Sequence, residues 1–151
     1  MKRSVGLVLH RDGAAGVEVL VGHMGGPFFA RKDEGGWSFP KGLVEDDEAP
    51  LVAAEREFAE EMGSVAPPGR SVDLGEVTAS GKAFRMFARA GDFDADAAVS
   101  NTFEMEWPRG SGRMQSFPEI DRAAWVTLDD AERLLAKGQR PFVDRLRAAL
   151  G

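Results

Sequence analysis

The chain of 151 residues contains no cysteine and no tyrosine, and only two histidines, His10 and His23. The absence of cysteine excludes disulfide bonds, thiolate zinc sites and a cysteine nucleophile, and it is compatible with a cytoplasmic location. Both histidines lie in β-rich runs without zinc-type spacing, so we expect ordinary strand residues. No apolar run approaches the roughly 20 residues that span a bilayer, so we predict no membrane segment.

The charge of the chain is unevenly distributed. It has 25 acidic and 19 basic residues, a formal net charge of −6. A protein that binds duplex nucleic acid needs a basic surface, so we expect no such partner. Residues 45–61 hold eight acidic residues against Arg56 alone, whereas the rest of the chain has 18 basic and 17 acidic residues. The acidity is therefore local and does not exclude a polyanionic ligand that arrives with divalent cations.

The order of turn residues and apolar patterns predicts one mixed α/β domain over residues 1–151, without internal repeats. Pro50 suits the first turn of a helix and Gly63 suits its end. We expect two more helices near the C-terminus, at residues 129–137 and 141–150. We expect strands at residues 5–11, 17–21, 37–39, 74–79, 83–90, 102–107 and 123–128.

Three carboxylates share one face of the helix that begins at Pro50. Each helical residue advances by about 100°, so Glu57, Glu60 and Glu61 fall within roughly 100° of arc. Such a face is either a solvated acidic surface or a site for hard cations such as Mg²⁺ and Mn²⁺, which prefer oxygen ligands. A turn at Gly42 can bring a backbone carbonyl to the same ions.

The spacing over residues 42–63 decides between these readings. It consists of Gly42, five residues, Glu48, seven residues, Arg56-Glu57, Phe58, one residue, Glu60-Glu61, one residue and Gly63. This pattern resembles the signature box of the Nudix hydrolases. The chain departs from it at Ser64, where the family usually has an apolar residue, but that position is one of packing and Val65 can replace it.

The resemblance implies an α/β fold, an α/β/α sandwich around a mixed sheet. It also implies hydrolysis, with Mg²⁺ or Mn²⁺, of a nucleoside diphosphate linked to another moiety. By position, Glu57 and Glu61 match the main metal ligands, with the Gly42 carbonyl as a third. Glu60 matches an accessory ligand or the base that activates water, so Glu60 and Glu61 are the candidate catalytic residues. Finally, Glu48 and Arg56 match a pair with the structural role of holding the loop.

Residues outside the box supply further candidates. Lys41 is either a cationic contact for the leaving phosphate or a surface lysine. Trp37 and Arg31 are candidate substrate-binding residues, although an aromatic ring here also suits the core. Glu104 and Glu106 point to one side of a predicted strand by period two, where they form either an extra base or ligand or a solvated face.

The substrate is less well defined than the reaction. The lead-in Trp37-x-x-Pro40-Lys41-Gly42 is similar to that of diadenosine polyphosphate and diphosphoinositol polyphosphate hydrolases. We expect a small-molecule nucleotide, first of all a nucleoside or dinucleoside polyphosphate. The alternatives are an oxidised nucleoside triphosphate, a nucleotide sugar, a diphosphoinositol polyphosphate, or a non-catalytic nucleotide-binding module. The sequence leaves open whether the protein is a monomer or a homodimer.

Overall fold

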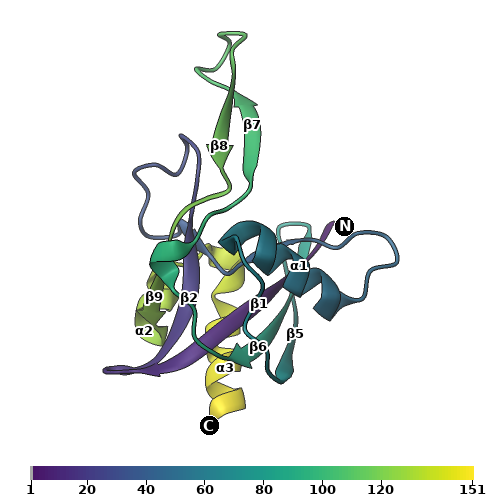
Figure 1. The fold of residues 1–151 in the computed structure, drawn as a ribbon, viewed down its shortest axis with the longest axis vertical. Coiled ribbons are helices and arrows are strands. Elements are labelled where there is room, and N and C mark those ends of the chain that lie inside the picture. Colours follow the sequence, from purple (N-terminus) through teal and green to yellow (C-terminus); the bar gives the residue numbers. More distant parts are fainter. Residues whose placement is uncertain (1) are drawn as a thin grey trace.

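The computed structural model describes residues 2–151 and is built on a seven-stranded mixed sheet (Figure 1). Strands β1 and β6 run parallel, and the other neighbours are antiparallel. One edge of β1 is shared, because β4 pairs with its first half and β2 with its second half. The strands of the sheet are β1 (Lys2–Gly13), β2 (Gly16–Met24), β3 (Trp37–Ser38), β4 (Lys41–Leu43), β5 (Ser71–Ala79), β6 (Lys82–Ala90) and β9 (Ile120–Thr127).

Helices cover both faces of this sheet. Helix α1 (Pro50–Met62) packs on one face, and α2 (Leu128–Leu134) and α3 (Pro141–Leu150) pack on the other (Figure 1). Side chains of β1 alternate between the two layers, so Leu7 and Leu9 meet α1 whereas Val8 faces the opposite layer. Two short 3₁₀ turns, η1 (Ala95–Ala97) and η2 (Lys137–Gln139), complete the connections. The predicted α/β/α sandwich is confirmed.

Helix α1 has the predicted ends. Pro50 occupies the first turn, where its missing N–H costs nothing. Gly63 ends the helix with a φ of 83°, and its N–H donates to the Ala59 carbonyl. The buried face, which includes Phe58 and Met62, packs against β1. Glu57, Glu60 and Glu61 lie on the side of the helix next to β4, whereas Glu55 pairs with Arg89 of β6.

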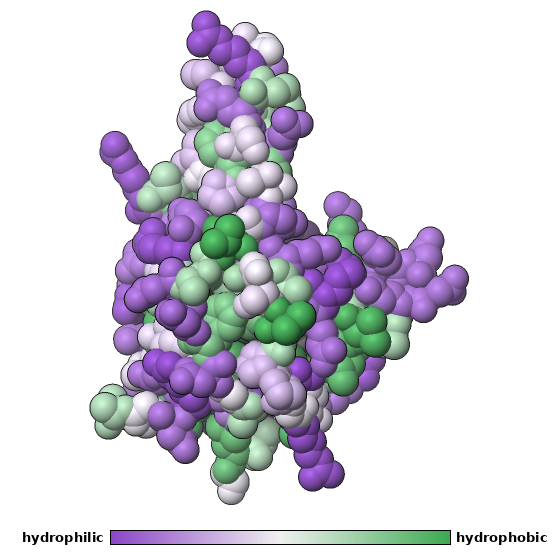
Figure 2. All heavy atoms as spheres, in the orientation of Figure 1, coloured by the Kyte–Doolittle hydropathy of each residue, from purple (hydrophilic) through white to green (hydrophobic). Residues whose placement is uncertain are grey.

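A two-stranded hairpin stands outside the sheet. It consists of β7 (Thr102–Glu106) and β8 (Met114–Pro118), and it projects from the body of the molecule (Figures 1 and 2). Its half-buried side chains lie over the loop that follows β2, where the ring centroids of Trp107 and Phe28 are 5.6 Å apart. The strand expected at residues 102–107 is confirmed, but β8 was not predicted, because its exposed residues lack a clear apolar alternation.

Most remaining predictions agree with the structure to within a few residues. The hairpin of β1 and β2 and that of β5 and β6 both form, and β5 begins three residues earlier than expected. Helix α2 ends at Leu134 rather than at residue 137. Both histidines lie in strands, His10 in β1 and His23 in β2. No helix within residues 2–151 is long and apolar enough to cross a membrane.

Candidate functional site

Strand β4 and helix α1 meet at Gly42. The pairing of Gly42 with Val5 of β1 fixes the strand beside the middle of the helix. A Cβ atom built on Gly42 would lie 2.0 Å from Oε2 of Glu57, closer than any real contact. Only glycine therefore lets the Glu57 carboxylate lie against this backbone. The structure thus brings together two of the predicted metal ligands.

Arg56 binds the loop before α1 to the helix. Its guanidinium contacts both oxygens of Glu48, with Nε 2.7 Å from Oε2 and Nη2 3.0 Å from Oε1. Nη2 also donates to the Leu43 carbonyl at 3.0 Å, and Nη1 donates to Glu57 at 2.9 Å and to Glu60 at 3.2 Å. The hydrogen bonds from Arg56 lower the pKa of the Glu48 carboxyl. The predicted structural pair is thus in contact, and it fixes residues 43–48.

Glu61 is the most buried carboxylate of the helix. Its side chain is 7% exposed, and Oε2 has no hydrogen-bond partner among residues 2–151. Burial raises the pKa of Glu61 to about 8, against the lowering effect of the Lys41 charge and backbone N–H. Burial also raises the pKa of Glu57, which the hydrogen bond from Arg56 counteracts. The site therefore contains carboxylates that hold protons more tightly than usual.

Residues of β4 and α1 border a cavity of about 310 Å³, which we call the acidic cavity. A smaller recess of about 150 Å³ shares Lys41, Glu61 and Glu119 with it and adds the rings of Phe29 and Phe103. The acidic cavity is lined by Lys41, Gly42, Leu43, Glu57, Glu60, Glu61, Asn101 and Glu119.

Glu119 is the residue of this cavity that the sequence did not reveal. It lies between β8 and β9, and its backbone is fixed because its N–H donates to Asn101 and its carbonyl accepts from Gly25. The extra carboxylates expected from the sequence, Glu104 and Glu106, lie on the projecting hairpin and do not line the cavity. The only sequence signal for Glu119 is an acidic residue directly before the strand that starts at Ile120.

The three predicted substrate-binding residues lie in different places. Lys41 lines the acidic cavity and the adjoining recess. Trp37 is 6% exposed, lies in the core and donates its indole N–H to Asp33 at 3.0 Å, so it does not line the cavity. Arg31 is exposed on the loop after β2 and is also not part of the lining.

The donor set suits a hard divalent cation. All acidic groups of the cavity offer oxygen, and the buried Oε2 of Glu61 lacks a partner that a cation would supply. Nevertheless, no three acidic or histidine side chains within residues 2–151 are already grouped as a metal site. Glu57 and Glu60 share Nη1 of Arg56 instead. A cation therefore fits this site if these two carboxylates turn away from Arg56.

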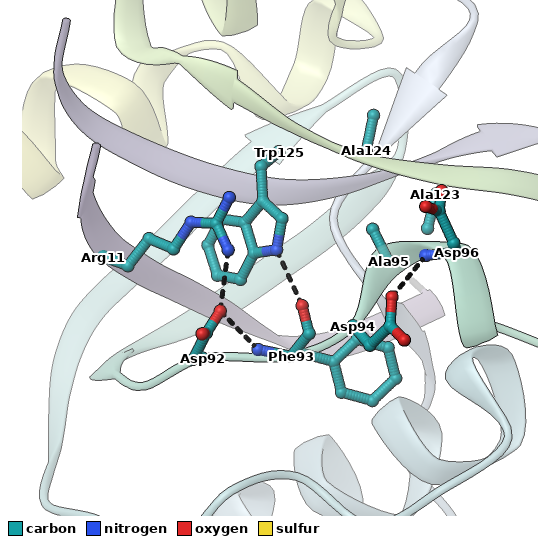
Figure 3. Close-up of a pocket in the computed structure, with 9 residues that line it drawn as sticks. All are labelled: Arg11, Asp92, Phe93, Asp94, Ala95, Asp96, Ala123, Ala124 and Trp125. Atoms are coloured by element: carbon teal, nitrogen blue, oxygen red, sulfur yellow. Dashed lines mark hydrogen bonds and ion pairs between the residues drawn. The ribbon is translucent and has the colours of Figure 1, made fainter. Parts of the chain in front are cut away.

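A larger hollow of about 670 Å³ lies elsewhere, between β9 and the segment that follows β6 (Figure 3). Its polar groups already bind one another. Arg11 contacts Asp92 at 2.7 Å and covers the ring of Trp125 at 4.1 Å, and the Trp125 N–H donates to the Phe93 carbonyl at 2.8 Å. We therefore assign this hollow a structural role and regard the acidic cavity as the candidate functional site.

Solved structures of other proteins have a similar fold. The chain is similar to the Ap4A hydrolase of C. elegans in a binary complex, with 21% identity, a TM-score of 0.65 and coverage of 99% of this chain and 98% of that one. It is similar to the NUDIX domain of Shewanella oneidensis NrtR complexed with ADP ribose, with 18% identity, a TM-score of 0.64 and coverage of 99% and 88%.

A third structure, the Nudix hydrolase RenU of M. smegmatis, is 23% identical, with a TM-score of 0.59 and coverage of 97% of this chain and 84% of that one. No curated protein matches the sequence. These structural likenesses show a shared fold, whereas the family rests on a sequence model. The model of the NUDIX domain matches residues 1–146. The chain therefore belongs to the Nudix hydrolase family.

Proposed function

We propose that the protein hydrolyses the phosphoric anhydride bond of a nucleoside diphosphate linked to another moiety, and that nucleoside or dinucleoside polyphosphates are its preferred substrates. One observation carries this proposal. The helix carboxylates, Gly42 and Lys41 surround one cavity, in which a buried oxygen of Glu61 has no partner among residues 2–151. The active unit is a monomer or a homodimer.

Glu57, Glu60, Glu61 and the Gly42 carbonyl are the groups that would hold Mg²⁺, with Mn²⁺ as a substitute. Divalent ions at such a site neutralise phosphate charge and lower the pKa of a bound water. The chain itself contributes the position of these ligands, because Arg56 holds the loop of Gly42 against the helix. The burial of Glu61 excludes water from part of the site, which strengthens its electrostatic interactions.

In the reaction, water attacks one phosphorus, a new P–O bond forms and the bridging P–O bond breaks. The proton of the water passes to a carboxylate. We assign this base to Glu119, whose side chain lines the cavity and makes no hydrogen bond or ion pair with residues 2–151. Glu60, the base expected from the sequence, is held by Arg56. The negative charge that develops on the leaving phosphate faces Lys41.

The substrate class has support of two kinds. Two similar structures are an Ap4A hydrolase and a domain complexed with ADP ribose, and both of these nucleotides contain a nucleoside diphosphate linked to another moiety. The lead-in to the box, which includes Lys41, is similar to that of diadenosine polyphosphate hydrolases. We therefore place dinucleoside polyphosphates first among the substrates to be tested.

An activity screen with Mg²⁺ or Mn²⁺ tests the proposal, using dinucleoside polyphosphates, nucleoside triphosphates, nucleotide sugars and ADP-ribose. Glu61→Gln should lower turnover roughly 100-fold while the protein stays folded, because one ligand of the site loses its charge. Glu104→Gln, on the exposed hairpin, is the matched control and should keep full activity. Unchanged turnover in Glu61→Gln would contradict the mechanism. Nucleotide binding without turnover in the wild type would instead indicate a non-catalytic module.

A further inference from the structure

His23 of β2 is fully buried, and both nitrogens of its ring contact oxygen atoms that only accept hydrogen bonds. Nδ1 lies 2.9 Å and 3.1 Å from the two carboxylate oxygens of Asp121 in β9, and Nε2 lies 2.6 Å from the carbonyl oxygen of Lys32. A neutral imidazole carries one N–H, whereas an imidazolium carries two. Both contacts therefore form as hydrogen bonds only when the pair of His23 and Asp121 holds one proton more than a neutral ring beside a carboxylate.

A β-bulge directs Asp121 toward this ring. The register of β2 and β9 pairs His23 with Arg122, and the next pair is Met24 with Ile120. Asp121 is therefore the extra residue of β9 at this point, and a bulge re-aims the side chain that it carries. The Asp121 side chain is 30% exposed against 1% for His23, so the carboxylate meets solvent while it compensates the charge of the buried ring.

The charged groups around the ring come from β9 and from the loop after β2. Within residues 2–151, Asp121 is the only acidic residue that pairs with His23, and Arg122 lies 3.5 Å from Oδ1 of this aspartate. From β3, the ring of Trp37 packs against His23 in a T-shaped arrangement with 5.2 Å between centroids, and Asp33 accepts its indole N–H. The protonation of His23 is therefore coupled first of all to Asp121.

The Lys32 carbonyl belongs to the turn that carries Phe29. The N–H of Lys32 donates to the Phe29 carbonyl at 3.0 Å, so the two residues are part of one turn. The ring of Phe29 lines the recess of about 150 Å³, which shares Lys41 and Glu119 with the acidic cavity. Through one carbonyl, His23 thus holds the turn that forms a wall of this recess.

We propose that His23 is a positioning residue, which together with Asp121 holds the Phe29 turn against the recess while the pair carries its extra proton, and which releases the turn when that proton leaves. The effect on a substrate rests on the proposed function, because the recess adjoins the cavity assigned to hydrolysis. A released turn must be ordered again when a substrate binds, which weakens binding. Loss of the proton therefore raises KM and leaves the chemical step unchanged.

Nitrogen NMR tests the protonation directly, since the chain has only two histidines. At pH 6 we expect both ring nitrogens of His23 to carry protons in the wild type. In Asp121→Asn the amide can donate to a bare Nδ1, so we expect a neutral ring with its proton on Nε2 and an intact contact to Lys32. His10→Gln removes the other histidine, which is half-buried in β1, and assigns the signals. A neutral His23 ring in the wild type at pH 6, or the same protonation in both proteins, overturns the proposal.

Kinetics over a pH series test the effect on the site. With saturating Mg²⁺ and diadenosine tetraphosphate, we expect the ratio of the wild-type KM to that of Asp121→Asn to rise roughly tenfold from pH 6 to pH 9 at similar kcat, about the factor that one hydrogen bond to a charged group contributes. Comparison at equal pH removes the ionisation of Glu61 and Glu119, which both proteins share. Asp121→Ala should show the higher KM already at pH 6, whereas His10→Gln should follow the wild type. A constant ratio of KM, or an effect on kcat alone, overturns the proposal.

Hydrogen exchange of the Lys32 amide needs no substrate and separates this inference from the proposed function. Compared with Asp121→Asn at the same pH, exchange should be faster in the wild type at pH 9 and in Asp121→Ala at pH 6. If the wild type hydrolyses no nucleotide but exchange differs in this way, the proposed function is wrong and the role of His23 in holding the turn stands. If Glu61→Gln abolishes hydrolysis but both Asp121 variants exchange and hydrolyse like the wild type, the hydrolase stands and His23 has no positioning role.

Discussion

The carboxylate of Glu57 lies directly against the α-carbon of Gly42, where an added methyl group would be 2.0 Å from Oε2. Through this contact, the helix that carries the acidic residues touches the strand that carries Lys41. Any side chain larger than hydrogen at position 42 would therefore displace the Glu57 carboxylate from the place it occupies here.

We expect Gly42→Ala to separate these two groups. The atoms nearest to the added methyl group all belong to the flexible end of the Glu57 side chain, so we expect this carboxylate to turn aside, activity to fall roughly 100-fold and the free energy of unfolding to change little. Steady-state kinetics and urea denaturation measure the two effects. Gly81→Ala is a control, because Gly81 has a φ of 75° and open space around it, so the variant should lose stability and keep activity. Full activity in Gly42→Ala would contradict the assigned contact.

The raised pKa of Glu61 predicts a pH-dependent stability in the absence of metal. The carboxyl holds its proton to about pH 8 in the folded protein but only to about 4.5 when unfolded. The folded state thus binds more protons between these values, and stability falls as pH rises from 4.5 to 8, by a few kcal/mol as an order of magnitude. Urea denaturation in EDTA should show this fall in the wild type.

Glu61→Gln provides the comparison for this pH series. Glutamine stays neutral at every pH, so its stability should lack the fall that Glu61 causes between pH 4.5 and 8. The variant should therefore gain most over the wild type above pH 8. Parallel stability curves for the two proteins would show that Glu61 ionises without cost.

Metal binding should release a proton from the same residue. At pH 7 the metal-free Glu61 carries a proton that a cation must displace. We expect a release of about one proton per bound Mg²⁺ at pH 7, falling toward zero at pH 9. Calorimetry in two buffers of different ionisation enthalpy measures it. Equal binding heats in both buffers at pH 7 would contradict this prediction. The Glu61→Gln variant should release fewer protons per bound Mg²⁺ than the wild type.

Arg56→Lys should show how much the loop depends on the guanidinium. Lysine keeps the charge but cannot contact both oxygens of Glu48 and the Leu43 carbonyl together. We expect a loss of about 1–3 kcal/mol in the free energy of unfolding and weaker Mg²⁺ binding. Arg133→Lys, at an exposed arginine with longer contacts, should change neither quantity. Thermal unfolding with and without Mg²⁺ measures both.

Glu119→Gln tests the assignment of the base. We expect kcat to fall at least about 100-fold, with little change in KM. Glu106→Gln on the hairpin removes the same charge outside the cavity and should behave like the wild type. If Glu60→Gln lowers kcat by this factor and Glu119→Gln does not, the base is Glu60, as the resemblance to the signature box implied.

Local patterns in the sequence predicted much of this site. The helix from Pro50 to Gly63 depends on residues close in sequence, whose spacing is visible directly, and the resemblance to the signature box implied the pairing of Glu48 with Arg56. Glu119 and the contact of His23 with Asp121 depend on strand pairing between distant segments, for which one sequence contains no signal. Trp37 illustrates a further limit of sequence analysis. An aromatic residue beside the box is compatible both with packing in the core and with contact to a ligand, and the structure places it in the core.

Strand β1 has a consequence for how the site assembles. It contacts both hydrophobic layers, holds Gly42 through Val5 and places Lys2 beside Lys82. Because side chains alternate along a strand, a slip of one residue would exchange the two layers and turn Lys2 away from its partner. The acidic cavity therefore depends on a single register of β1, and a chain in which β1 pairs one residue out of place does not form it.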